Sequence, residues 1–210
     1  MEYLEHLHKD KKLSPVILQH GPMEELKIRK HIPFLLMASI MSQQLSTKVA
    51  SVIKTRFLDL YGGKIPPSQQ VLDTPSEQLR AIGLSNAKVS YIKNVAAFCI
   101  EHKITDKKLM VLSNEEIIDL LTQIKGVGRW TVEMLLMFSL GREDIFAIDD
   151  WGLQNAVIKI YKLKIEDKKK LKEKIIRISS RWSPYRSYAS LYLWRWKDNA
   201  PVTSETKSKK

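Results

Sequence analysis

The chain has 210 residues, which is long enough for one helical core or for two small lobes. Hydrophobic residues make up 44% of it, and this ordinary fraction excludes wholesale disorder. Lys and Arg number 35 against 23 Asp and Glu, so the net charge is +12 at pH 7. A charge of this size favours a polyanionic partner, with nucleic acid ahead of an anionic membrane surface.

The cysteine content and the N-terminal segment bear on the compartment. The only cysteine, Cys99, excludes an intramolecular disulfide and a cysteine-rich zinc or iron–sulfur site. The N-terminus is charged from Glu2 and lacks the apolar core of a signal peptide, and no apolar run approaches the ~20 residues of a membrane span. We therefore expect a soluble monomer of a reducing compartment, the cytoplasm and its nucleoid if the source is bacterial.

Apolar residues recur mainly at helical spacing and no alternating strand pattern appears, so the predicted fold class is all-α. Residues 32–63 are predicted to form one long helix or two consecutive ones, closed by Gly62 and Gly63. Thr74, Asn86 and Ser113 are predicted to cap the next three helices. The remaining predicted helices cover 129–140, 149–163, 165–182 and 183–196.

Two glycines bracket a valine in "LLTQIKGVGRWTVEM", residues 120–134. We predict that one helix ends near Ile124 and the next starts after Gly128, with Val127 as a hydrophobic plug between them. Glycine is unfavourable inside a helix, so the pair indicates a tight turn or the close approach of another molecule. The backbone N–H groups at such a helix start suit a phosphate. An ordinary helix end would also use these glycines, but the flanking helices and the net charge favour DNA.

The segment "DIFAIDDWGLQ", residues 144–154, places two acids after an apolar run. Taken alone, Asp149 or Asp150 is more simply explained as a helix N-cap, whose carboxylate accepts backbone N–H bonds. The hairpin upstream makes a functional role for the aspartates more plausible, because the hairpin and the aspartate pair occur together at a characteristic spacing.

Together these motifs resemble the helix–hairpin–helix DNA glycosylase superfamily, and within it the AlkA-type 3-methyladenine DNA glycosylases (type II). The resemblance rests on "GVGRWT" followed by "FAIDDWGLQ", and the stretches "SIMSQQLSTKVA" and "WSPYRSYASLYLWRW" agree with it. It covers roughly residues 20–198. It implies a single domain, residues 1–210, with helical lobes at about 30–125 and 126–198 around a basic cleft and a loose basic tail at 200–210.

The resemblance also implies a role for particular residues. Asp150 is the expected catalytic carboxylate, stabilising the positive charge that develops on the sugar. Trp130 is expected to line the pocket for a flipped base, with Tyr188 and Trp182 as weaker candidates. The expected contacts to the DNA backbone come from Gly126, Gly128 and Thr131.

Two further roles remain open between alternatives. Gln43 or Gln44 is expected to fill the gap left in the base stack, although helix capping would explain either glutamine equally well. The tryptophans at 130, 182, 194 and 196 could all belong to the core, and this is the default for Trp194 and Trp196. No cofactor is required by the expected chemistry, but a Na or K ion is expected on the hairpin carbonyls of Thr122, Ile124 and Val127.

Position 130 bears on the type of reaction. Relatives that also cut the DNA strand carry a lysine there, which attacks the sugar as an amine. With tryptophan at this position we predict a DNA-3-methyladenine glycosylase without lyase activity, acting on double-stranded DNA that contains damaged bases. The rival functions are the same fold acting on an oxidised, deaminated or mismatched base, and a non-catalytic DNA-binding module, which would have no use for Asp150.

Overall fold

The computed structural model describes residues 1–164 and 167–199, whose regular structure is helical. The one β pairing within these ranges is an isolated antiparallel bridge between Ile28 and Leu140. In the same ranges no helix is long and apolar enough to cross a membrane. The predicted all-α class is confirmed, whereas the predicted tail at 200–210 lies outside the described residues.

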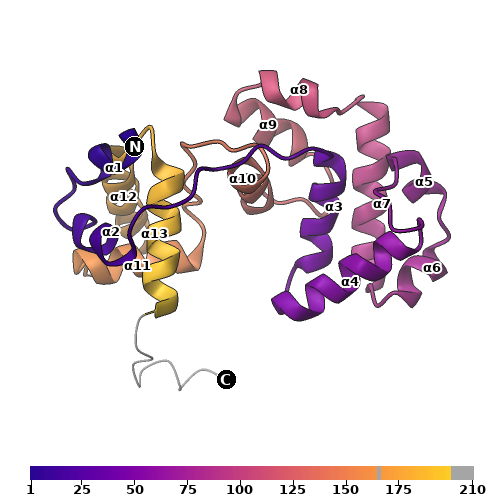
Figure 1. The fold of residues 1–210 in the computed structure, drawn as a ribbon, viewed down its shortest axis with the longest axis horizontal. Helices are drawn as coiled ribbons and strands as arrows, with labels where there is room; N and C mark the ends of the chain where they lie inside the picture. The colour runs from indigo at the N-terminus through magenta and orange to yellow at the C-terminus, as the bar shows by residue number, and fades with distance from the viewer. Residues whose placement is uncertain (165–166, 200–210) are drawn as a thin grey trace. The chain divides into compact units, whose positions relative to one another are not determined.

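Two compact units divide the chain (Figure 1). Unit 1 joins Met1–Leu26 to the chain from Arg142 onward, and unit 2 is Lys27–Gly141. The helices of unit 1 are α1 (Glu2–Leu7), α2 (Ser14–His20), α11 (Trp151–Tyr161), α12 (Lys168–Ser179), the 3-10 helix η1 (Ser180–Trp182) and α13 (Arg186–Asn199). The helices of unit 2 are α3 (Ile32–Ser42), α4 (Thr47–Asp59), α5 (Ser68–Asp73), α6 (Ser76–Ala81), α7 (Asn86–Glu101), α8 (Asp106–Val111), α9 (Asn114–Leu121) and α10 (Arg129–Phe138).

The boundary between the units differs from the predicted one between residues 125 and 126. The chain from 126 to 141 belongs to unit 2 because α10 packs against α3 and α9. The second helix of the hairpin is therefore in the same unit as the first. The aspartate pair, in contrast, is in unit 1.

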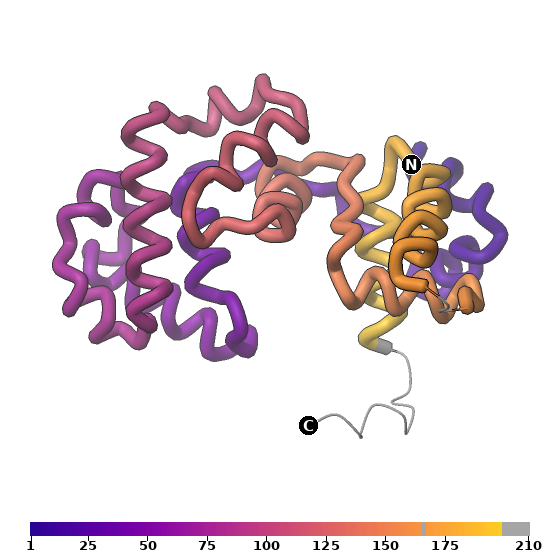
Figure 2. The backbone as a smooth tube through the Cα atoms, turned by 180° about the vertical axis from the view of Figure 1, so that it is seen from behind, coloured from indigo at the N-terminus to yellow at the C-terminus, as the bar shows by residue number. Residues whose placement is uncertain are grey.

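Each unit is built around one largely buried helix. In unit 2 this helix is α3, which lies beside α7 and also packs against α4 and α10 (Figure 2). Its buried residues are Ile32, Phe34, Leu36, Met37, Ile40 and Met41. In unit 1 the corresponding helix is α13, which packs against α2 and α11 and buries residues on most of its circumference. Helices that bury most of their surface provide the apolar area that stabilises such small units.

The stretch 32–63 forms two helices, the second of the two predicted forms. The break is a short turn, 43–46, in which Gln43 ends α3 with an extended ψ of 133° and Ser46 caps α4. Ser113 caps α9 as predicted, and Glu116 completes a capping box with it. The other two predicted caps are wrong: Ser85, not Asn86, caps α7, and Thr74 donates to Gln70 O at the end of α5.

Candidate active site: the hairpin, its hollow and the aspartate pair

The two glycines of the hairpin meet different constraints. The helices α9 and α10 flank the turn, which confirms the predicted helix–hairpin–helix. At Gly126 φ is +102°, and an added Cβ would lie 2.2 Å from Cγ of Tyr91 on α7. The backbone angle and the packed ring each require glycine there. Gly128 has an ordinary φ of −93° and open space around its missing Cβ, so the fold itself does not require glycine at this position.

The rest of the turn is held by packing and by α7. Val127 is buried, as expected of a hydrophobic plug between the helices. Asn94 on α7 donates from Nδ2 to Lys125 O at 3.0 Å. The shape of the turn is therefore set from inside unit 2, which leaves the exposed Gly128 available to an outside partner.

The N-terminus of α10 has no side-chain cap. The helices α4, α7, α9, α11 and α12 each begin after a serine or aspartate whose side chain accepts a first-turn N–H. Gly128 occupies the same position before α10 and has no side chain to accept one. An exposed, uncapped helix start concentrates N–H donors and the positive end of the helix dipole, both of which suit an anion.

The three carbonyls expected to hold a monovalent cation lie in the same turn. Ile124 O accepts from Val127 N at 2.9 Å and retains a second lone pair. Among the backbone–backbone hydrogen bonds of the described turns and loops, none ends on the carbonyl of Thr122 or Val127. Carbonyl oxygens are the kind of ligand that a hard cation prefers.

A hollow of about 560 Å³ lies beside the hairpin in unit 2. The tryptophan of the hairpin motif opens onto it, since Trp130 is 45% exposed. The turn between α3 and α4 forms its other wall. The lining residues are Ser39, Ser42, Gln43, Gln44, Leu45, Trp130, Thr131 and Met134. The predicted base-pocket aromatic and both candidate plug residues therefore share one hollow.

Three of the polar residues that line this hollow, Gln43, Gln44 and Thr131, are placed differently. Thr131 is only 4% exposed, and its Oγ1 accepts from Nε2 of Gln43 at 3.4 Å. The hydroxyl of Thr131 is therefore largely covered within unit 2, and its predicted contact with a DNA backbone stays a prediction. Gln43 is half-buried by the same contact, whereas Gln44 is exposed and has a left-handed φ of 59°.

The aspartate pair precedes α11 in unit 1, and its two members have different partners. Asp150 is the N-cap of α11, and its Oδ1 accepts from Leu153 N at 2.8 Å. Asp149 pairs with Lys172 of α12, with 2.7 Å between Oδ1 and Nζ. The expected catalytic residue is thus also the helix cap, so of the two aspartates that could have capped α11 it is Asp150 and not Asp149 that does.

Trp194 of α13 is a second partner of Asp150. Its Nε1 donates to Asp150 Oδ1 at 3.1 Å, and the indole also lines a hollow of about 300 Å³ in unit 1. Sequence reasoning assigned this residue to packing, because two residues 44 apart in the sequence carry no local signal of their contact. Charge-assisted hydrogen bonds of this kind fix the orientation of a carboxylate.

The motif "RSYA" in the last helix positions the segment that leads to the aspartates. Nε of Arg186 donates to Asp144 Oδ1 at 2.6 Å, and Ile145 N donates to Ser187 Oγ at 3.0 Å. Ser187 Oγ in turn donates to Arg142 O at 2.6 Å. Arg186 and Ser187 thus hold residues 142–145 against α13. This segment continues through Phe146 and Ala147 to the aspartate pair.

The two weaker base-pocket candidates have a packing role instead. Trp182 is 1% exposed, contacts Phe146 edge-on, and donates from Nε1 to Asp10 at 3.1 Å. Burial raises the pKa of Asp10, but hydrogen bonds, chiefly from Tyr161 and also from Trp182, outweigh burial and hold this pKa below its ordinary value.

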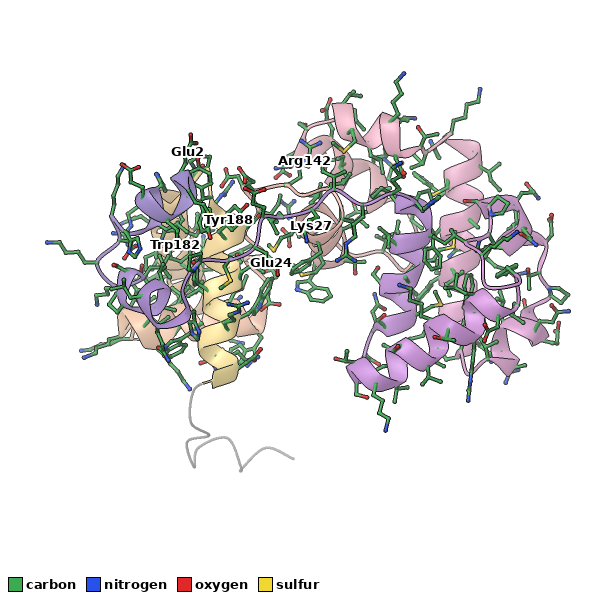
Figure 3. All side chains as sticks on the ribbon, viewed as in Figure 1. Glu2, Glu24, Lys27, Arg142, Trp182 and Tyr188 are labelled. Carbon is green, nitrogen blue, oxygen red and sulfur yellow. The ribbon has the colours of Figure 1, made fainter. Side chains whose placement is uncertain are left out.

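Tyr188 is 2% exposed and stacks on Tyr3 of α1, with ring centroids 4.0 Å apart. Its hydroxyl donates to Glu143 Oε1 at 3.0 Å. Figure 3 labels Tyr188 and Trp182, both enclosed among the helices of unit 1. Neither ring has a face left for a DNA base, because each is covered by its own unit.

Comparison with known proteins gives one consistent answer. The model of the HhH-GPD superfamily base excision DNA repair proteins matches residues 37–181. The chain is 35% identical over 202 residues to DNA-3-methyladenine glycosylase 1 of Schizosaccharomyces pombe, covering 95% of this chain and 87% of that protein. It is 30% identical to the DNA-3-methyladenine glycosylase of Saccharomyces cerevisiae, covering 90% and 76% of the two proteins.

Solved structures agree with the sequence comparison. The Schizosaccharomyces pombe 3-methyladenine DNA glycosylase in complex with abasic DNA has a TM-score of 0.84 at 32% identity, covering 97% of this chain and 100% of that one. The DNA-3-methyladenine glycosidase of Bacillus halodurans has a TM-score of 0.80 at 34% identity, covering 92% and 88%. This chain belongs to the HhH-GPD superfamily of base excision DNA repair proteins.

Proposed function

We propose that this protein removes alkylated purines of the 3-methyladenine type from double-stranded DNA, by base flipping and hydrolysis of the N-glycosidic bond, without cutting the strand. The observation that carries the proposal is Trp130, a half-exposed indole in the hollow beside an uncapped hairpin helix. An aromatic face attracts a cationic, alkylated base by stacking and by cation–π interaction. The names of the relatives point to the same substrate.

We expect no lyase activity because of the side chains that line the hollow. Strand cleavage by this class of enzyme needs an amine that attacks the sugar. In the described chain none of the eight residues lining the hollow carries an amine, and the position at which lyase relatives have lysine is Trp130. Hydrolysis by water is therefore the expected reaction, and it leaves an intact strand with an abasic site.

Each remaining step has a residue suited to it. The amides at Gly128 and at the start of α10 would hold a phosphate, and a Na or K ion on the hairpin carbonyls would add positive charge at that contact. Gln44 is the better candidate to fill the base stack, because it is exposed whereas Gln43 is bonded to Thr131. Asp150, oriented by Leu153 N and Trp194 Nε1, would stabilise the oxocarbenium-like transition state.

An alkylated purine already carries a positive charge and leaves readily, so no strong general acid is required. This is why one carboxylate suffices in the proposed mechanism. The same carboxylate is what separates the proposal from a non-catalytic DNA-binding module, which would need the hairpin but no charge at position 150.

The test uses duplexes that contain 3-methyladenine, an oxidised purine, a deaminated base or a mismatch, incubated with the wild-type protein. We expect release of free 3-methyladenine, strand breaks only after alkali, and no covalent complex on reduction with borohydride. Release of a different lesion alone would replace the substrate assignment. Breaks without alkali, or a borohydride-trapped complex, would overturn the monofunctional assignment, and tight binding without release of any base would leave the non-catalytic module as the explanation.

A further inference from the structure

In the turn between α3 and α4, one side chain donates hydrogen bonds to two backbone carbonyls. At the end of α3, Ile40 O accepts from Gln43 N and Ser42 O accepts from Leu45 N. Helix ends leave such carbonyls without intrahelical donors, and each needs a partner from elsewhere. Two further carbonyls of this turn, those of Met41 and Gln43, both accept a hydrogen bond from the side chain of Lys88.

Lys88 reaches this turn from the first turn of α7. Its Nζ donates to Met41 O at 2.8 Å and to Gln43 O at 2.7 Å. The ion pairs formed among the described residues do not include Lys88, so its charge is directed at carbonyl dipoles and at the negative end of α3. The side chain of Lys88 is partly buried, and this burial lowers the pKa of the ammonium.

The position of Lys88 is locally unfavourable. It is the third residue after the cap Ser85, where the positive end of the helix dipole disfavours a cation. A lysine here is explained by the carbonyls that it bonds rather than by the needs of its own helix.

Gln44 follows these carbonyls in the chain, and its side chain is exposed. Gln44 has a left-handed φ of 59°, a conformation that is unfavourable for a residue with a Cβ and that persists only where neighbours fix the chain. The neighbour on its N-terminal side is Gln43, whose carbonyl belongs to the peptide that joins the two glutamines. Lys88 therefore holds the peptide plane from which Gln44 projects.

We propose that Lys88 is a positioning residue for base flipping: its ammonium fixes the turn that presents Gln44 to the gap in the DNA stack. The inference rests on the proposed function, because it takes Gln44 as the residue that fills the gap. It assigns Lys88 no contact with the base or the sugar. Its effect should appear in the complex with a flipped or missing nucleotide and not in binding to intact duplex.

The test compares three variants. Lys88→Met keeps an unbranched stem and removes all donors, and Lys88→Arg keeps a charged donor and should restore much of the function. Lys93→Met is the matched control, since Lys93 lies on the same helix and donates from Nζ to Leu72 O at 3.1 Å, at the end of α5 and away from the turn. Urea unfolding of all three shows what each substitution costs the fold.

Two readouts separate positioning from general structure. The first readout compares two affinities: that for a duplex containing a tetrahydrofuran abasic analogue, and that for the same duplex without damage. We expect Lys88→Met to weaken the first roughly tenfold or more, the effect of losing hydrogen bonds to a charged group, and to leave the second unchanged. The second is the single-turnover rate of 3-methyladenine release, which should fall by a similar factor in Lys88→Met but not in Lys93→Met.

A double-mutant cycle completes the test. If Lys88 acts through Gln44, then Lys88→Met should add little to Gln44→Ala in either readout. Additive losses, equal losses on damaged and undamaged duplex, or a Lys93→Met variant as impaired as Lys88→Met would overturn the inference. So would a Gln44→Ala variant with unchanged affinity. In each of these cases base release by the wild type still stands, so failure of this inference is distinct from failure of the proposed function.

Discussion

The turn before α10 and the turn before α11 place their important residues in opposite ways. In the hairpin, the demands of the fold and of a partner fall on separate residues: Gly126 is required by its φ and by Tyr91, whereas Gly128 is exposed and unconstrained. Before α11 both demands fall on Asp150, which caps the helix and carries the expected catalytic charge. In the hairpin, substitutions at two different positions can therefore separate folding from function. At Asp150 only a substitution that keeps the cap and removes the charge can separate them.

The largest expected effect is that of Asp150→Asn. Asparagine caps a helix about as well as aspartate, so the stability should change by only ~0.5 kcal/mol or less. Loss of the charge removes an electrostatic contribution typical of a preorganised site, and the single-turnover rate of 3-methyladenine release should fall at least roughly 10²–10³-fold. Unfolding in urea and quenched-flow assays measure the two quantities on one preparation.

Asp150→Ala is the control for this separation, because it removes both the charge and the cap. It should show the same loss of rate with an additional ~1 kcal/mol loss of stability. If Asp150→Asn kept most of the activity, the residue would be a helix cap and nothing more.

The next effect is on folding, at Gly126→Ala. An alanine at φ +102° is strained, and its Cβ would overlap the ring of Tyr91. Strain and overpacking together should lower the free energy of unfolding by about 2–4 kcal/mol. Urea unfolding measures this loss, and a Tyr91→Ala background should relieve the overlap but not the strained backbone. A variant as stable as the wild type would show that the turn does not have the conformation described above.

Gly128→Ala should have the opposite signature in the same hairpin. Its φ suits alanine and its Cβ has room, so the stability should stay within ~0.5 kcal/mol of the wild type. A methyl group would, however, stand between the backbone and an approaching phosphate, and the affinity for duplex DNA should fall roughly tenfold. Titration at several salt concentrations measures it, and unchanged affinity would remove Gly128 from the DNA contact.

These comparisons show which parts of the molecule could be predicted from sequence. The hairpin and the cap at Ser113 were predicted correctly because their signals are local: glycines at a helix boundary, and a serine followed by acids in the first helical turn. The break in 32–63 was left undecided, since "MSQQLS" continues a helical pattern and the donors that stabilise the turn come from Lys88, 45 residues beyond Gln43.

The site residues that sequence reasoning misjudged have distant partners. Trp182 and Tyr188 were candidates for a base pocket, but residues of the N-terminal segment, Asp10 and Tyr3, enclose them. Burial depends on packing across the whole unit, and a short motif carries no information about it. The functional roles of Asp150, Trp130 and the glycines stay predictions until they are measured.

The smallest expected effect is that of Asp149→Asn, which sharpens the contrast within the aspartate pair. Asp149 is exposed, and its ion pair with Lys172 is of the kind that contributes ~0–1 kcal/mol. The substitution should leave the rate of base release within about twofold and should change stability by less than about 0.5 kcal/mol, with any change shrinking further at high salt. Release assays and urea unfolding at two salt concentrations measure this. A large loss of rate would mean that the charge of Asp149 acts on the reacting sugar together with that of Asp150. The two carboxylates would then form one functional pair, and the contact between Asp149 and Lys172 would not be a mere surface ion pair.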